Sequence, residues 1–94
     1  MRYARAMQFP FISKNGVLLG ATEAHIPIDR IEYQYGFGVY ETIRVVAGKP
    51  RFAEEHLERL FNSASIIGLE HHFEASFVRG ALLAMIEKID VAIL

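Results

Sequence analysis

Two helical patterns of apolar residues follow one another in the second half of the chain. In the stretch EEHLERLFNSA, four apolar residues recur at i, i+3, i+4 and i+7: Leu57, Leu60, Phe61 and Ala64. This spacing predicts an amphipathic helix over about 53–67, with Gly68 at the position of a left-handed C-terminal cap. A longer apolar stripe predicts a second helix over about 75–89.

The first half of the chain carries strand and turn signals instead. Asn15-Gly16 stands between FPFIS and VLLG and predicts a tight β-hairpin. The clearest strand is VYETIRVV (39–46), for which we predict a turn over 47–50 and a short returning strand over 51–53. Strands in a run followed by helices predict an α+β fold, with an antiparallel sheet and two helices.

Side chains of the 39–46 strand are expected to alternate between two faces. One face is apolar except for one carboxylate: Val39, Glu41, Ile43 and Val45. The other face is polar: Tyr40, Thr42 and Arg44. A carboxylate on a packed face needs a partner, so we interpret Glu41 as a structural acid held by the backbone or by an arginine.

Length and composition restrict the class of protein. The chain has 94 residues, a net charge of −1 and no cysteine, and 52% of its residues are apolar. These values predict one globular domain that is cytoplasmic and binds neither nucleic acid nor membranes. The chain ends in DVAIL, and we interpret Val91–Leu94 as the start of a buried strand. We therefore expect residues 1–94 to be one incomplete domain at the beginning of a longer polypeptide.

Arg59 shares a polar face of the first predicted helix with His56 and Ser63, and it has two interpretations. It can pair with Glu55, four residues earlier, or it can face an anion. The other candidates are weaker. The adjacent His71-His72 pair lacks a metal-ligand pattern, and we expect all three lysines to be exposed: Lys14, Lys49 and Lys88.

Residues 35–69 closely resemble the N-terminal part of the fold-type IV pyridoxal-phosphate enzymes. These are the class IV aminotransferases, which include branched-chain and D-amino-acid aminotransferases and the related aminodeoxychorismate lyase. The matching pattern is a YG-x-G-V-[FY]-E strand, a G-[KR]-P turn, and a helix with E-H-x-x-R-L and S-A. The Asn15-Gly16 hairpin and the Asp29-Arg30 pair also stand where the family has them.

The resemblance implies transfer of an amino group between an amino acid and a 2-oxo acid, with pyridoxal 5′-phosphate as cofactor. It implies that Arg59 binds the cofactor phosphate. Three positions match the substrate side of the family's site: Tyr40, Thr42 and Arg44. Tyr35 matches a tyrosine that reaches the neighbouring subunit's site, and a homodimer is implied.

The family's Schiff-base lysine and the glutamate that faces the pyridine nitrogen lie beyond residue 94. We therefore expect no catalytic residue in these 94 residues, and no transaminase activity from them alone. Glu41-Thr42 replaces the Glu-Gly pair typical of branched-chain enzymes and is closer to the lyase and D-amino-acid branches. Two alternatives remain: a lyase that eliminates pyruvate, and a non-catalytic remnant or dimerisation module.

Overall fold

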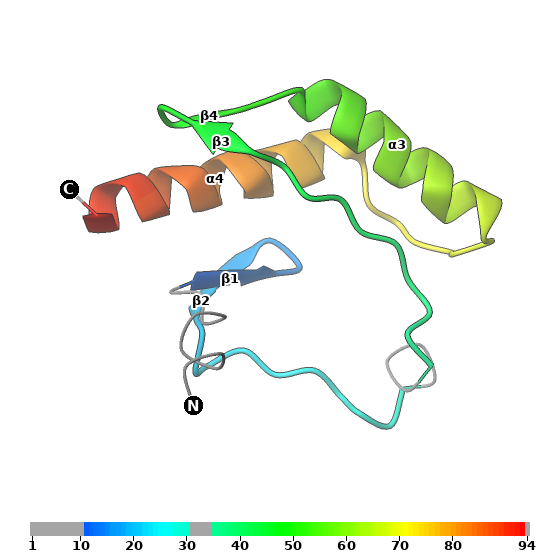
Figure 1. The fold of residues 1–94 in the computed structure, drawn as a ribbon. Helices are drawn as coiled ribbons and strands as arrows, with labels where there is room; N and C mark the ends of the chain where they lie inside the picture. The colour runs from blue at the N-terminus through cyan, green and yellow to red at the C-terminus, as the bar shows by residue number, and fades with distance from the viewer. Residues whose placement is uncertain (1–10, 31–34, 94) are drawn as a thin grey trace, which may run out of the picture.

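A computed structural model of the chain describes residues 11–30 and 35–93, the last four of these by their backbone alone. The described residues form an α+β fold of two small antiparallel sheets and two helices (Figure 1). The elements are β1 (Phe11–Lys14), β2 (Val17–Gly20), β3 (Val45–Val46), β4 (Lys49–Pro50), α3 (Ala53–Ile66) and α4 (Ala75–Ile93). Instead of one sheet, the strands therefore make two separate hairpins.

The β1–β2 hairpin confirms the prediction from Asn15-Gly16. The register runs from Phe11 opposite Gly20 to Lys14 opposite Val17. Both turn residues have positive φ, 53° and 84°, as a two-residue turn of this kind requires. The first two residues of the predicted strand FPFIS lie outside the described residues.

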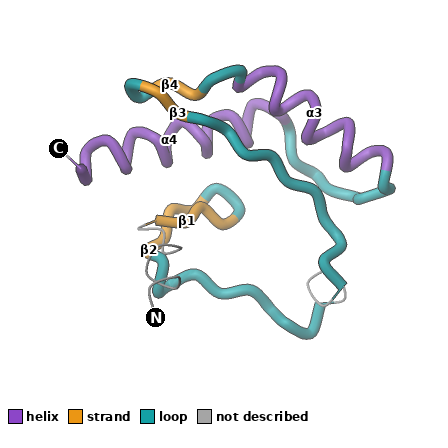
Figure 2. The backbone as a smooth tube through the Cα atoms, in the orientation of Figure 1, coloured by secondary structure: helices purple, strands orange, loops and turns teal. Residues whose placement is uncertain are grey.

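The strand predicted over 39–46 is wrong for most of its length. Only Val45–Val46 pairs, with Lys49–Pro50, around a tight turn at Ala47-Gly48. The turn is shorter than expected, so the returning strand starts at residue 49 and not at residue 51. The described residues between β2 and β3 form no helix or strand (Figure 2). A strand needs a hydrogen-bonded neighbour, and only the Arg51 N–H to Arg44 C=O bond extends the pairing.

Helix α3 has the predicted ends. Phe52, which precedes it, is in the left-handed region, and two glutamates occupy the first turn, where the helix dipole favours acids. At the other end the Gly68 N–H donates to the Ser65 C=O and the Leu69 N–H to the Ala64 C=O. These two bonds form a Schellman motif, with Gly68 at a φ of 74°.

Helix α4 extends further than the predicted 75–89. It continues to Ile93, so the strand predicted over 91–94 is wrong for residues 91–93, and Leu94 lies outside the described residues. A short apolar run does not distinguish a strand from a buried helix, and neither glycine nor proline interrupts the chain here. Helix propagation adds one hydrogen bond per residue, which favours continuation.

Helix α4 lies between α3 and the β1–β2 hairpin and contacts both (Figure 1). Arg79 of α4 joins the helices through a two-point ion pair with Glu54, at 2.6 and 2.7 Å. Three apolar side chains among the described residues are more than nine-tenths buried: Leu57, Ala64 and Ile86. The apolar stripe of α3 thus faces the core as predicted. None of the described helices is both long and apolar enough to cross a membrane.

Candidate functional site

The clearest polar cluster joins the loop before β3 to helix α3. We call its three members, Glu41, His56 and Arg59, the Glu41 cluster. Burial around Glu41 alternates as predicted: Val39, Glu41 and Ile43 are half-buried, and the residues between them are exposed. His56 and Arg59 stand at i and i+3 on α3 and share one face of the helix. The Glu41 side chain therefore points at the helix, where both of its partners lie.

Arg59 binds Glu41 with one edge of its guanidinium group. Its Nε lies 3.0 Å from each carboxylate oxygen, and its Nη2 lies 2.8 Å from Oε1. Such two-point, charge-assisted contacts are stronger and more directional than single hydrogen bonds. The structural interpretation of Glu41 is confirmed, and the pairing of Arg59 with Glu55 is replaced by a partner 18 residues away.

His56 is the second partner of the same carboxylate. Its Nδ1 lies 2.6 Å from Glu41 Oε1, and the side chains of the two residues are 17% and 14% exposed. The hydrogen bonds from Arg59 and His56 lower the pKa of Glu41 from 4.5 to about 2. The hydrogen bond between Arg59 and Glu41 also raises the pKa of Arg59. The Glu41–Arg59 pair is therefore ionised throughout the physiological pH range.

Arg59 keeps one nitrogen available. None of the described interactions uses its Nη1, and the side chain is 65% exposed. A guanidinium group has five N–H donors in a rigid planar fork, so an edge fixed by a carboxylate orients the remaining donors. The two N–H groups of Nη1 can therefore donate, in a fixed orientation and from a charged group, to an anion that arrives from solvent.

Tyr35 and the three positions predicted on the substrate side lie at the surface. Tyr35 is 77% and Tyr40 85% exposed, and Thr42 and Arg44 are exposed as well. No described contact joins any of them to Arg59. Tyr40 and Thr42 flank Glu41 in the chain, and the alternation of burial places them on the side that faces away from the core.

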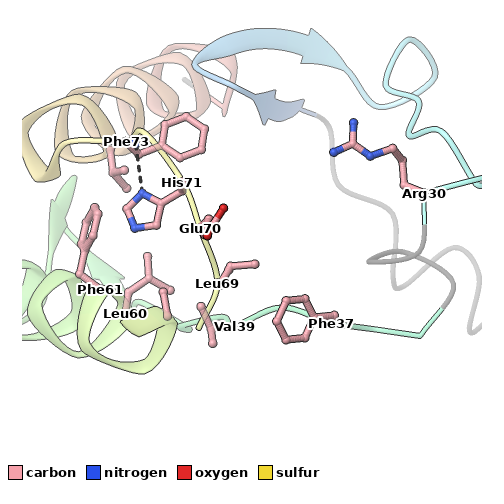
Figure 3. A pocket seen from close by; sticks show the side chains of 11 residues that line it. Arg30, Phe37, Val39, Leu60, Phe61, Leu69, Glu70, His71 and Phe73 are labelled. Carbon is pink, nitrogen blue, oxygen red and sulfur yellow. Dashed lines mark hydrogen bonds between the residues drawn. The ribbon is translucent and has the colours of Figure 1, made fainter. Parts of the chain in front are cut away.

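A hollow of about 420 Å³ lies beside α3 and the loop that follows it (Figure 3). The ring of His71 lies 5.2 Å from that of Phe61 and 6.1 Å from that of Phe73, and its Nδ1 accepts a hydrogen bond from the Phe73 N–H. Most of the other lining residues are apolar, and Arg59 is not among them. The hollow and the Glu41 cluster are therefore separate features of the surface.

The structure also places the histidine pair and the three lysines that the sequence singled out. His71 and His72 are exposed, and no group of three potential ligands in residues 11–30 and 35–93 can hold a metal ion. Lys49 and Lys88 are exposed as expected. Lys14 departs from the expectation, because it is half-buried and its Nζ donates to the C=O of His25.

Comparison of the sequence with known proteins identifies the family of the chain. A sequence model of the class IV aminotransferases matches residues 38–93, which contain all three members of the Glu41 cluster. The chain belongs to the class IV aminotransferase family. This chain is the N-terminal segment of that family's fold, so the resemblance seen in residues 35–69 is confirmed.

Curated relatives of the chain include several D-alanine aminotransferases. The enzyme of Bacillus licheniformis is 34% identical over 73 residues, which are 78% of this chain and 26% of that protein. That of Listeria monocytogenes serotype 4b is 35% identical over 77 residues, 82% of this chain and 27% of that protein. The chain spans about a quarter of the length of these relatives. No solved structure matches it significantly.

Sequence reasoning placed His56 on the same face as Arg59 but gave it no role. The signal for a role was the spacing His-x-x-Arg, which aligns the two side chains along one helix face. This spacing indicates a role for His56 only when the contact with Glu41 is known. Glu41 lies 15 residues earlier in the sequence, so local spacing does not predict the contact. The partner of a loop carboxylate cannot be read from local spacing.

Proposed function

We propose that this chain forms the N-terminal part of a pyridoxal-phosphate-dependent aminotransferase, in which Arg59 binds the cofactor phosphate. The observation that carries the proposal is the geometry of Arg59. Glu41 fixes its Nε and Nη2 edge, while the side chain is 65% exposed and none of the described interactions uses Nη1. The family match over 38–93 supports the cofactor, because aminotransferases of this class use pyridoxal phosphate.

The donor chemistry fits a phosphate group. A phosphate offers three oxygens that accept charge-assisted hydrogen bonds, and a guanidinium group is the side chain best matched to them. Glu41 offsets part of the positive charge, but it also removes the conformational freedom that Arg59 would otherwise lose on binding. Arg59 then holds the phosphate end of the cofactor and fixes its orientation.

The exposed side of the 39–44 segment is proposed to face the substrate. Tyr40 and Thr42 offer hydroxyl groups, and Arg44 offers a cation suited to the carboxylate of an amino acid or a 2-oxo acid. Tyr35 is proposed to reach the site of a second subunit in a homodimer. Pyridoxal phosphate, when bound, supplies the electron sink for amino-group transfer, and the protein supplies binding and orientation.

Among the branches of the family, we propose action on a D-amino acid. Two observations support this branch over the branched-chain enzymes: the relatives reported above are D-alanine aminotransferases, and Glu41-Thr42 stands in place of a Glu-Gly pair. The lyase on the same scaffold and a non-catalytic dimerisation module are the competing proposals. Elimination of pyruvate without amino transfer would favour the lyase.

The test compares cofactor binding with folding in matched arginine variants. Pyridoxine 5′-phosphate is the probe, because it lacks the aldehyde and cannot react with lysines. We expect Arg59→Ala to lower its affinity about tenfold or more, the factor for one lost charge-assisted hydrogen bond. Arg79→Ala, which breaks the other two-point ion pair, should leave the affinity unchanged. Equal loss in both variants would contradict a phosphate role for Arg59.

A second test addresses the expected absence of a catalytic residue. The chain contains three lysines, Lys14, Lys49 and Lys88. After incubation with pyridoxal phosphate, borohydride reduction and peptide mapping, we expect diffuse or no labelling. A single modified lysine would show that this segment carries the reactive amine itself and would overturn the proposal that the amine lies elsewhere.

A further inference from the structure

We propose that His56 is a positioning residue, which holds the Glu41 carboxylate and thereby aims Arg59 at the cofactor phosphate. This proposal rests on the proposed binding of the cofactor phosphate by Arg59. It adds His56 as the residue that keeps the Arg59 side chain oriented for that binding. It follows from three contacts that converge on one carboxylate and come from the same helix.

The direction of the His56 hydrogen bond follows from the state of its partner. Glu41 is ionised, since its pKa is lowered to about 2, and an ionised carboxylate only accepts hydrogen bonds. The Nδ1 atom, 2.6 Å from Oε1, therefore carries the hydrogen and donates it. This contact fixes both the ring orientation and the tautomer of His56.

The same reasoning assigns the Arg59 contacts. Nη2 lies 3.3 Å from His56 Nδ1 and 2.8 Å from Glu41 Oε1. Because Nδ1 donates to the carboxylate, it has no lone pair for Nη2, and both donors converge on Oε1 instead. Glu41 Oε1 thus receives one hydrogen bond from His56 and one from Nη2, while Nε bridges both oxygens.

The requirement for a second anchor comes from the position of Glu41 in the chain. Residues 39–44 belong to no strand, and the described backbone hydrogen bond that reaches this segment lies at its end, from the Arg51 N–H to the Arg44 C=O. No described backbone hydrogen bond holds Glu41 itself. His56 and Arg59 both project from α3, whose C-terminal end is capped and whose Leu57 is buried. Without His56, the carboxylate would be held from one direction only and could rotate about its terminal torsion, which is soft. The guanidinium group would then lose its fixed orientation.

The test uses two amides that differ in where they place a donor. The side-chain nitrogen of Asn can occupy the position of histidine Nδ1, whereas that of Gln reaches the position of Nε2. The measured quantity is the affinity for pyridoxine 5′-phosphate divided by that for pyridoxine, which isolates the contribution of the phosphate. We expect His56→Gln to lower this ratio about tenfold and His56→Asn to keep it within about twofold of wild type.

Each outcome decides a separate claim. A ratio unchanged in His56→Gln, with a reduced ratio in Arg59→Ala, would overturn the role of His56 and leave that of Arg59 intact. Equal reduction in His56→Gln and His56→Asn would also overturn it, because the donor position would then be irrelevant. A wild-type ratio near one would overturn the phosphate site itself. Urea denaturation of each variant separates loss of folding from loss of positioning, and rescue by Asn alone supports the proposal.

Discussion

Arg59 and Glu41 form a two-point ion pair between α3 and the loop before β3, with Nη2 2.8 Å and Nε 3.0 Å from the carboxylate. The pair links two segments that share no strand or helix. It orders the side chain proposed to bind the phosphate, and it also ties the 39–44 segment to the core helix. The same ion pair is therefore expected to contribute to the stability of the fold and to the orientation of Arg59 in the candidate site.

The first prediction concerns acid stability. The pKa of Glu41 is about 2 in the folded chain, against 4.5 ordinarily. A lowered pKa means that the carboxylate stabilises the fold above pH 4.5 and loses this effect as the pH falls toward 2. We expect Glu41→Gln to be less stable at neutral pH and to lose less stability on acidification, as measured by urea denaturation at pH values from about 7 to about 2.5.

The control is Glu58→Gln, since Glu58 is exposed on the same helix and has no ion pair among the described contacts. Its acid profile should follow the wild type. Glu54, whose pKa is also lowered by Arg79, remains in both variants, so the profile of Glu41→Gln should be shallower but not flat. Parallel profiles for wild type and Glu41→Gln would show that the Arg59 contact does not persist in solution.

The sequence predicted the helices better than the strands, for a physical reason. A helix satisfies its hydrogen bonds locally, so the stripe on α3, its acidic first turn and Gly68 are all visible in the sequence. A strand depends on a distant partner. The segment VYETIRVV has high strand propensity, yet only Val45–Val46 pairs. Propensity without a neighbour does not make a sheet.

The candidate site was predictable in part. Arg59 and the need of Glu41 for a partner followed from the pattern, and the structure connects the two. That they are each other's partner did not follow, since they lie 18 residues apart. The role of His56 depends on a 2.6 Å contact, which sequence spacing cannot show. The exposed Tyr40 and Thr42 were placed on the correct face by simple alternation.

The second prediction ranks two residues of the α3 stripe. Leu57 is 3% exposed, whereas Phe61 is half-buried and lines the open hollow. Leu57→Ala should lower the free energy of unfolding by about 2–4 kcal/mol, because it leaves a cavity in closed packing. Phe61→Ala should cost less than Leu57→Ala despite the larger deletion, since one side of its ring already faces solvent. Urea denaturation of both variants measures the order, and the reverse order would mean that the hollow is filled in solution.

The third prediction compares the two hairpin turns. Both have positive φ at both central residues, with Asn15 at 53° in one and Ala47 at 52° in the other. Asparagine tolerates this conformation better than alanine. Ala47→Asn should therefore stabilise the chain by about 0.5–1 kcal/mol, and Asn15→Ala should destabilise it by a similar amount. Thermal denaturation tests both, and a destabilising Ala47→Asn would mean that the β3–β4 turn is not formed as described.

The last prediction contrasts Gly80, which lies within α4, with Gly68, which follows the C-terminal end of α3. A Cβ atom at Gly80 meets nothing within 4 Å, and the φ of Gly80 is not positive. Gly80→Ala should therefore stabilise α4 by up to about 1 kcal/mol, through helix propensity and a less flexible unfolded chain. Gly68→Ala should do the opposite, because Gly68 caps α3 at a φ of 74° although the space around it is equally open.

Gly80→Ala and Gly68→Ala make the same chemical change, because each adds one methyl group to open space. Any difference between them therefore reports the backbone conformation at the two positions. Urea denaturation should give shifts of opposite sign. If Gly80→Ala destabilises the chain, another surface covers α4 at Gly80 in solution, and the exposed face of α4 is an interface. If both variants stabilise it, the left-handed cap at Gly68 does not form, and α3 ends differently from the described Schellman motif.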